Sequence, residues 1–368
     1  MDFIRNSPRF CPSSPLDHKS DGLLKVAVTL ASTRPITIAV DAMGGDHGPR
    51  VTVPACLQSL ECHSDLRITL VGQRDAIGAF LGDGARRFSE RITVQDASQI
   101  VAMDEKPQDA LRKKKDSSMR IAIDLVKSGA ADACVSAGNT GALMATARFV
   151  LKTIEGIDRP AIISRIRSRR GHTHMLDLGA NAECTAEHLF QFAVMGSVVA
   201  SDMQGIERPR IGILNIGEEE MKGDGVVKEA SRLLGTSKLN YIGFVEGGDI
   251  FSGDVDVVVT DGFTGNVALK SIEGVASMLV DALRAEYTRN PLRYLGAAAS
   301  WPVLRSLRRE FDPRTYNGAS MVGLTNVVIK SHGSADQFSF GNAIHVALIE
   351  AQKGVPTQIG NLLRSQLS

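Results

Sequence analysis

Five segments of this chain place glycine and polar side chains directly after an apolar run. They are VDAMGGDHG (40–48), VSAGNTG (135–141), LDLGAN (176–181), LNIGEEEMKGDG (214–225) and VTDGFTGN (259–266). Glycine lets the backbone come close to a ligand, and the free N–H groups at the start of a helix attract anions. In a parallel sheet such turns gather at the carboxyl edge of the strands. The five turns therefore predict one anion-binding crevice along that edge.

Two side chains in these turns are candidates for direct chemistry. Lys222 could hold a phosphate or stabilise a developing oxyanion, or it could be a solvated lysine that answers Glu218–Glu220. Asn266 could donate its amide to a carbonyl oxygen or cap a helix. Nine further residues are candidate contacts for an anion or substrate, and each could instead serve only its own turn: Asp41, Gly44, Gly45, Asp46, Gly138, Asn139, Thr140, Gly141 and Asp261.

Several common functions lack their motifs in this chain. There is no G-x-x-x-x-G-K-[ST], no G-x-G-x-x-G after the first predicted strand, and no H-E-x-x-H or G-x-S-x-G. P-loop NTPases, standard dinucleotide-binding folds, zinc proteases and serine hydrolases are therefore disfavoured. The five cysteines form no C-x-x-C pair, so we expect no structural zinc, and we predict no metal or cofactor at the crevice.

The composition indicates a globular enzyme-sized chain. Its 368 residues are 43% hydrophobic, which allows a large buried core. The net charge of +1 argues against a globally basic nucleic-acid binder, so nucleic acid is not an expected partner. No apolar run reaches the roughly 18 residues that a membrane-spanning helix needs.

Short β-branched runs alternate with segments of helical period from residue 36 onward. We predict nine strands: Ile36–Asp41, Leu66–Val71, Arg91–Gln95, Asp132–Ser136, His174–Leu178, Arg210–Asn215, Tyr241–Val245, Val255–Thr260 and Asn326–Lys330. This alternation predicts a doubly wound, three-layer α/β/α sheet over 35–368. Pro8, Pro12 and Pro15 lie among serines and charges, so 1–34 is predicted to be a disordered extension.

A helical appendage is predicted over about 267–314. Ile272, Val275, Leu279 and Leu283 follow helical spacing, and the break at Asn290–Pro291 precedes a second helical stretch. Seven arginines between 284 and 314 are interleaved with apolar and aromatic residues. Such a protruding hairpin could pack on a partner subunit or lie on an anionic membrane surface, and the pattern alone favours neither.

Taken together, these segments resemble one known family, the bacterial phosphate acyltransferases. The matching stretches, in chain order, are IAVDAMGGDHGP (38–49), RKKKDSSM (112–119), ADACVSAGNTGALM (131–144), GIDRPA (156–161), LDLGAN (176–181), QFAVMGSV (191–198), LNIGEEEMKG (214–223), DVVVTDGFTGNVALKSIEG (256–274), and YNGASMVGL with VIKSHGSAD (316–336). The resemblance implies transfer of a long-chain fatty acyl group from fatty acyl-ACP to inorganic phosphate, at the start of phospholipid synthesis. It also implies a fold related to the isocitrate and isopropylmalate dehydrogenases and to the phosphotransacetylases.

The same resemblance implies partners and a location. It implies a homodimer in the cytoplasm, attached peripherally to the inner face of the cytoplasmic membrane, with the glycerol-3-phosphate acyltransferase of the next step as a further partner. An acidic carrier protein needs a basic docking face. The residues predicted to contact the carrier or the membrane are Arg112, Lys113, Lys114, Lys115, Arg293 and Trp301.

Carried over by motif, the resemblance assigns catalysis to Lys222 and Asn266. The turns at Gly44–Asp46 and Gly138–Gly141 would line the same crevice. Phosphate is already an oxyanion near neutral pH, so attack on a thioester needs positioning and oxyanion stabilisation rather than a serine or cysteine nucleophile. The chain departs from the family at 162–172, which is unusually basic.

Three alternative functions remain open at the level of sequence. A phosphate acetyltransferase-like enzyme that uses acyl-CoA would share the fold and the chemistry. A nicotinamide-dependent decarboxylating dehydrogenase would share the fold class. A non-catalytic scaffold on the membrane surface would use the basic hairpin without any acyl transfer.

Overall fold

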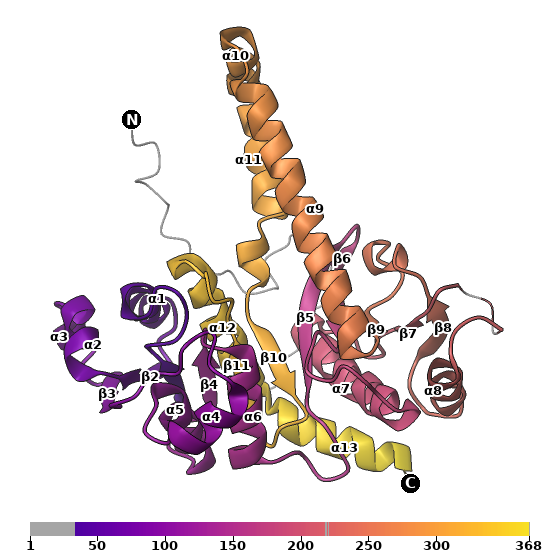
Figure 1. The fold of residues 1–368 in the computed structure, drawn as a ribbon, viewed down its shortest axis with the longest axis horizontal. Coiled ribbons are helices and arrows are strands. Elements are labelled where there is room, and N and C mark those ends of the chain that lie inside the picture. The colour runs from indigo at the N-terminus through magenta and orange to yellow at the C-terminus, as the bar shows by residue number, and fades with distance from the viewer. Residues whose placement is uncertain (1–33, 218, 220, 368) are drawn as a thin grey trace.

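The computed structural model describes residues 34–217, 219 and 221–367, and within them eleven strands form one sheet. The strands are β1 (Ile36–Asp41), β2 (Leu66–Gly72), β3 (Ile92–Asp96), β4 (Ala133–Ser136), β5 (Ala161–Ser168), β6 (Gly171–Leu176), β7 (Ile211–Leu214), β8 (Tyr241–Val245), β9 (Val257–Val259), β10 (Ala319–Val322) and β11 (Val327–Lys330). Their order across the sheet is β3-β2-β1-β4-β11-β10-β5-β6-β9-β7-β8, so segments distant in sequence meet at β11, β10 and β5 (Figure 1).

The sheet consists of two parallel halves that run in opposite directions. Strands β3, β2, β1, β4 and β11, the first half, pair in parallel, and so do β6, β9, β7 and β8, the second half. Between the halves, β10 is antiparallel to both β11 and β5, and β5 is antiparallel to β6. Three successive reversals leave the two halves opposed. The expectation that all five glycine turns share one edge of a parallel sheet is therefore wrong.

Helices cover both faces of the sheet. They are α1 (Pro49–Cys62), α2 (Arg74–Leu81), α3 (Gly84–Arg87), α4 (Pro107–Lys113), α5 (Ser118–Lys127), α6 (Thr140–Leu151), α7 (Ala186–Gln204), α8 (Gly225–Gly235), α9 (Gly262–Thr288), α10 (Pro291–Ala299), α11 (Trp301–Glu310), α12 (Gln337–Lys353) and α13 (Val355–Leu367), with the 3₁₀ turns η1 (Asp249–Phe251) and η2 (Pro313–Tyr316). In β1, Ile38 and Val40 join the core under α1, α7, α12 and α13. Ala39 joins the opposite core under α5 and α6. This alternation follows from the two-residue period of a strand.

Each of the nine predicted strands occurs, with its ends shifted by a few residues, but β5 and β10 were not predicted. β5 carries Arg165 and Arg167 among its apolar residues, and β10 is only four residues long. Both lie in the middle of the sheet, where their antiparallel pairing reverses its direction. The prediction for 1–34 lies outside the described residues, apart from Arg34, whose guanidinium forms an ion pair with Asp132.

A long helical arm leaves the sheet at α9. This helix runs for 27 residues away from the sheet, and α10 and α11 lead the chain back to the body, where Arg167 of β5 binds Glu310 at 2.6 Å (Figure 1). Asn290 caps α10 by accepting a hydrogen bond from the Arg293 N–H, at the break expected from Asn290–Pro291. Among the described residues, we find no helix with the length and hydropathy required to span a membrane.

The start of α9 is packed unusually tightly against the turn that follows β6. The Gly262 N–H donates to the Asn181 carbonyl at 2.7 Å. A Cβ atom added at Gly265 would lie only 1.9 Å from the Asp177 carbonyl oxygen. Both positions must therefore be glycine for the helix to begin this close to the turn.

We expect Gly265→Ala to lower the free energy of unfolding by about 1–3 kcal/mol, because the new methyl group must push α9 away from Asp177. Gly274→Ala, on the same helix with open space around its Cβ position, is the matched control. It should be neutral or stabilising, since alanine is the better helix former. Denaturant unfolding of both variants measures the difference, and equal stability would mean that α9 does not begin against this turn.

Candidate functional site

The first group of glycine turns follows β1, β4 and β11. Asp41 closes β1 and is only 1% exposed, and its Oδ2 atom accepts a hydrogen bond from Ser136 Oγ at 2.6 Å. Burial raises the pKa of Asp41, while hydrogen bonds from Ser118 and Ser136 act in the opposite direction. The carboxyl group is thus held at the base of the turns, where it fixes the end of β1 to the end of β4.

Glycines bring these turns into direct contact. A Cβ atom at Gly44 would lie 2.7 Å from the Gly138 nitrogen, so the turns after β1 and β4 touch through their backbones. Gly45 has a φ of +85° and lies against Ala137 and the Gly333 carbonyl. The Asp46 N–H donates to that same carbonyl at 2.9 Å, which adds the turn after β11. Gly44, Gly45, Asp46 and Gly138 therefore lie together in the structure.

Asn139 serves as the N-cap of α6. Its Oδ1 atom accepts from the Ala142 N–H at 2.9 Å, and its Nδ2 atom donates to the carbonyls of Met103 and Glu105. The side chain is therefore committed to the protein itself. Thr140 and Gly141, the first residues of α6, are exposed, so their side of the turn remains open to a ligand.

Lys330 belongs to this group, although our sequence analysis did not single it out. It closes β11, is 8% exposed, and its Nζ atom donates to the carbonyls of Ala137, at 3.2 Å, and of Ser331. Burial lowers the pKa of Lys330 to about 8, which outweighs the opposing effect of Asp41 and Asp46. Lysine at the end of the apolar run VVIK, before SHGSAD, was the signal in the sequence.

The second group of turns follows β6 and β9. Asp177 is fully buried and accepts hydrogen bonds from the N–H groups of Ile162, Ala180 and Asn181. Burial raises its pKa, and these hydrogen bonds oppose the shift. Asp261 is the N-cap of α9, where it accepts from Thr264. Both carboxyl groups thus satisfy backbone amides at the base of α9.

Asn266 lies in the second turn of α9 rather than at its cap. Its side chain is exposed and lies beside Gly179, whose missing Cβ would be 3.6 Å from the Asn266 Oδ1 atom. The capping alternative for Asn266 is thereby removed, because Asp261 occupies that position.

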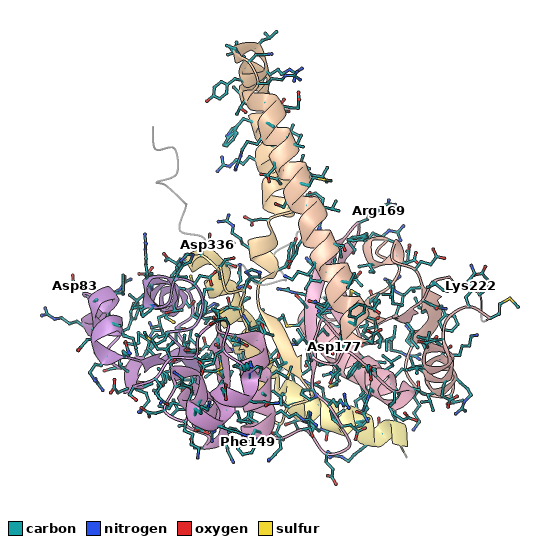
Figure 2. All side chains as sticks on the ribbon, in the orientation of Figure 1. Asp83, Phe149, Arg169, Asp177, Lys222 and Asp336 are labelled. Carbon is teal, nitrogen blue, oxygen red and sulfur yellow. The ribbon has the colours of Figure 1, made fainter. Side chains whose placement is uncertain are left out.

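Lys222 lies apart from Asn266, on the exposed loop between β7 and α8. Its Nζ atom forms an ion pair with Glu219 at 2.8 Å, and this contact raises the pKa of Lys222. Figure 2 shows Lys222 at the outer margin of the second half, whereas Asp177 lies near the base of α9. This position of Lys222 matches the alternative in which an exposed loop lysine forms ion pairs with neighbouring glutamates. Within the described part of the chain, the structure does not bring Lys222 into contact with Asn266.

The start of α9 connects the two groups of turns, although their strands are opposed. Ala268, Leu269 and Ile272 pack against a core that includes Ile162 of β5 and Met175 of β6, and Ala319 of β10 packs against the same core. Ala319 is the direct partner of Lys330 in the β10–β11 ladder. Lys270, one helical turn after Asn266, is close enough to Lys330 to lower its pKa further. We call this region, between Lys330 and residues 266–270 of α9, the seam.

The predicted basic patch lies one helix away from the first group of turns. Arg112, Lys113 and Lys115 are exposed, and Lys114 is partly buried. Their helix, α4, packs on α6, and Pro107 at its start lies against Gly141. The patch is thus fixed to the same helix whose N-terminus faces the candidate site.

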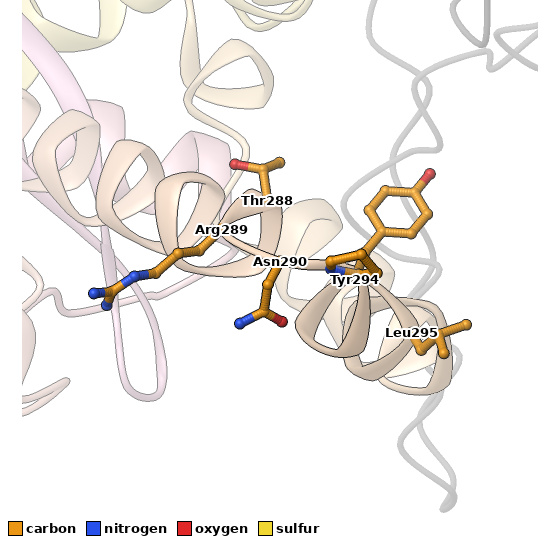
Figure 3. A pocket seen from close by; sticks show the side chains of 6 residues that line it. Thr288, Arg289, Asn290, Tyr294 and Leu295 are labelled. Atoms are coloured by element: carbon orange, nitrogen blue, oxygen red, sulfur yellow. The ribbon is translucent and has the colours of Figure 1, made fainter.

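The other predicted contacts lie at the far end of the arm. Arg293 forms an ion pair with Glu286, and the Trp301 side chain is exposed. A shallow hollow here is lined by Thr288, Arg289, Asn290, Pro291, Tyr294 and Leu295 (Figure 3). Among the described residues, we find no cluster of three His, Cys, Asp or Glu side chains suited to a metal ion.

Similar proteins place the chain in a family. The family model described as "Fatty acid synthesis protein" matches residues 36–358. Curated proteins named phosphate acyltransferase are 59% identical over 336 residues in Alkalilimnicola ehrlichii and 58% identical over 324 residues in Methylococcus capsulatus. These matches cover 91% and 88% of this chain, and 98% and 96% of the two relatives.

Solved structures of phosphotransacetylases share the fold. The enzyme from Streptococcus pyogenes matches with a TM-score of 0.57 and 18% identity over 87% of this chain and 94% of its own. The EutD phosphotransacetylase from Staphylococcus aureus matches with a TM-score of 0.54 and 17% identity over 87% of this chain and 96% of its own. The fold is thus a mixed α/β fold also used by phosphotransacetylases. The chain itself belongs to the fatty acid synthesis protein family and is an acyltransferase of the phosphate acyltransferase type.

Proposed function

We propose that this protein transfers a long-chain fatty acyl group from fatty acyl-ACP to inorganic phosphate, giving the acyl phosphate used in phospholipid synthesis. The observation that carries the proposal is the meeting of three glycine turns around Ala137, beside the buried Lys330, on which Lys270 of α9 acts from the other half of the molecule. The similarity of the chain to phosphate acyltransferases supports the reaction, since the aligned region covers almost the full length of those relatives. We assign the fold to the isocitrate and isopropylmalate dehydrogenase type.

In the proposed mechanism, phosphate is itself the nucleophile. A phosphate oxygen attacks the thioester carbon, and the resulting tetrahedral oxyanion collapses with cleavage of the C–S bond, so that the thiolate leaves on the carrier. In the turns at Gly44–Asp46 and Gly138–Gly141, the N–H groups of Asp46 and Gly138 are bonded to Gly333 and Ser136, so the phosphate is held by other N–H groups of these turns, such as those of Thr140 and Gly141 at the start of α6. Asn266 donates its amide to the thioester oxygen, where negative charge develops. Lys222 offsets the negative charge of the phosphate after its ion pair with Glu219 breaks. Breaking this ion pair costs little free energy, because exposed ion pairs are weak.

The patch Arg112–Lys115 is the proposed docking face for the carrier. Its support is position, because α4 is joined to the start of α6 through Pro107 and Gly141. A carrier bound there could deliver its flexible prosthetic group to the turns, whereas α10, at the far end of the helical arm, lies remote from the sheet (Figure 1).

The helical arm is the proposed site of dimer formation and membrane contact. Val275, Met278, Leu279 and Leu283 of α9 are each more than half exposed, which favours a second copy of the chain as their cover. Near the far end, Figure 3 shows the Tyr294 and Leu295 side chains projecting from α10 on one side, while Arg289 at the end of α9 points to the other. Apolar and aromatic tips beside arginines suit an anionic lipid surface. A membrane-bound dimer could pass its product directly to the glycerol-3-phosphate acyltransferase.

We expect Lys222→Ala and Asn266→Ala each to lower turnover by on the order of 10²-fold, as does loss of one oxyanion donor in other enzymes. The assay follows phosphate-dependent release of free carrier thiol from palmitoyl-ACP. Lys127→Ala, at an exposed lysine of α5, is the control for general loss of a positive charge. Full activity of a folded Lys222→Ala protein would remove Lys222 from the mechanism.

Charge reversal at the patch should weaken carrier binding alone. We expect Arg112→Glu combined with Lys115→Glu to raise KM for fatty acyl-ACP by on the order of 10-fold at low salt, with a smaller effect as salt screens the charges. The KM for phosphate should stay unchanged. Arg284→Glu on the arm is the matched control. A larger rise in KM for fatty acyl-ACP in the Arg284→Glu control would mean that the carrier docks on the helical arm instead.

Polar substitution near the far end of the arm should abolish membrane binding without affecting catalysis in solution. We expect Leu295→Ser combined with Trp301→Ser to reduce co-sedimentation with vesicles containing anionic lipid several-fold, because burial of apolar side chains anchors the arm. Phe80→Ser, at an exposed aromatic side chain of α2, is the control. Unchanged co-sedimentation of the double variant would exclude the arm as the membrane contact.

A further inference from the structure

Lys330 carries a buried charge without a hydrogen-bonded counter-ion. Its ammonium donates two hydrogen bonds, both to neutral backbone carbonyls, those of Ala137 and Ser331. Within residues 34–217, 219 and 221–367, no carboxylate forms an ion pair with it. Ammonium groups that are this deeply buried are normally paired, because leaving water is costly for a charge. One of the three ammonium N–H groups remains to be used.

The carboxyl groups near Lys330 do not fill this role. Asp41 directs its Oδ2 atom to Ser136, and its Oδ1 atom has no hydrogen-bond partner among the described residues. Burial favours the neutral form of Asp41 by raising its pKa. Asp46 is exposed, and its charge acts on Lys330 from a distance. Lys330 therefore has negative charge in its surroundings but, among the described residues, no carboxylate hydrogen-bonded to its ammonium.

A second lysine approaches the same place from the other half of the molecule. Lys270 on α9 acts on Lys330 as a like charge, although its own ammonium is bound to Glu273 at 2.7 Å. Two lysines from opposed halves of a sheet repel each other unless an anion lies between them. The seam also presents Asn266, one turn earlier on the helix, and the turns at Gly44 and Gly138, where backbones approach without side chains.

We propose that Lys330 is a further catalytic residue, which binds an oxygen of the phosphate substrate through its remaining N–H group and holds the anion at the seam. This proposal rests on the proposed transfer to phosphate. Lys330 stays protonated throughout: the phosphate oxygen forms the new bond to the acyl carbon, the C–S bond breaks, and the lysine only positions and neutralises the nucleophile. Asn266 then acts on the thioester oxygen, and Lys222 offsets charge as in the proposed mechanism.

The test separates phosphate binding from carrier binding. We expect Lys330→Met and Lys330→Gln to raise KM for phosphate roughly 10- to 100-fold, as does loss of a hydrogen bond to a charged group, with KM for palmitoyl-ACP within twofold of the wild type. Inorganic phosphate should raise the melting temperature of the wild type and of Lys127→Met, but not that of either Lys330 variant. A purely structural lysine would change the melting temperature without changing its response to phosphate.

Two outcomes would overturn the proposal. One is a folded Lys330 variant with unchanged KM for phosphate and unchanged stabilisation by phosphate. The other concerns Lys270→Met, which removes an exposed side chain and so tests the seam even if no Lys330 variant folds. It should raise KM for phosphate several-fold, and no change would contradict a phosphate between the two lysines. Absence of phosphate-dependent thiol release by the wild type would instead refute the proposed function.

Discussion

The reversal of strand direction between β11 and β6 is the constraint on which this molecule depends. Because β10 and β5 each pair antiparallel with their neighbours, the two halves present their carboxyl ends to opposite edges of one sheet. The base of helix α9 lies between them: it starts at the second half, packs against the same core as Ala319 of β10, and brings Lys270 close enough to act on Lys330 of the first half. A site built from both halves is therefore expected at the base of α9.

Buried polar groups hold the base of α9 and the first group of turns in place. Asp177 satisfies three backbone N–H groups below α9, and Asp41 joins β1 to β4 through Ser136. Around them, Gly265 and Gly44 remove the side chains that would keep the turns apart. The buried carboxyl groups hold the backbones of the turns in place, and the missing Cβ atoms let these backbones approach each other. Together they bring the turns close enough to surround a small anion.

Much of the fold could be predicted from the sequence, because nine strands carry strong apolar runs and their turns carry glycine. β5 and β10 could not, since Arg165 and Arg167 break the apolar pattern of the first and the second is very short. Without those two strands, the turns at 40–48 and 259–266 were placed on one edge. The structure brings Gly44, Gly45, Asp46 and Gly138 together. Lys330 lies within the matching stretch VIKSHGSAD, but its burial beside these turns depends on the pairing of β11 with β4, which local sequence does not fix. For Lys222 the sequence motif is specific, but the motif does not predict where the side chain lies. Its position depends on an exposed loop whose conformation local sequence does not fix.

The central claim is that phosphate binds at the seam, and a crystal structure with bound sulfate or phosphate tests it most directly. The account predicts one tetrahedral anion within hydrogen-bond distance of Lys330 Nζ and of backbone N–H groups in the turns at Gly44–Asp46 or Gly138–Gly141, facing Asn266. An anion bound only beside Lys222, with Lys330 still bonded to Ala137 and Ser331 alone, would contradict it.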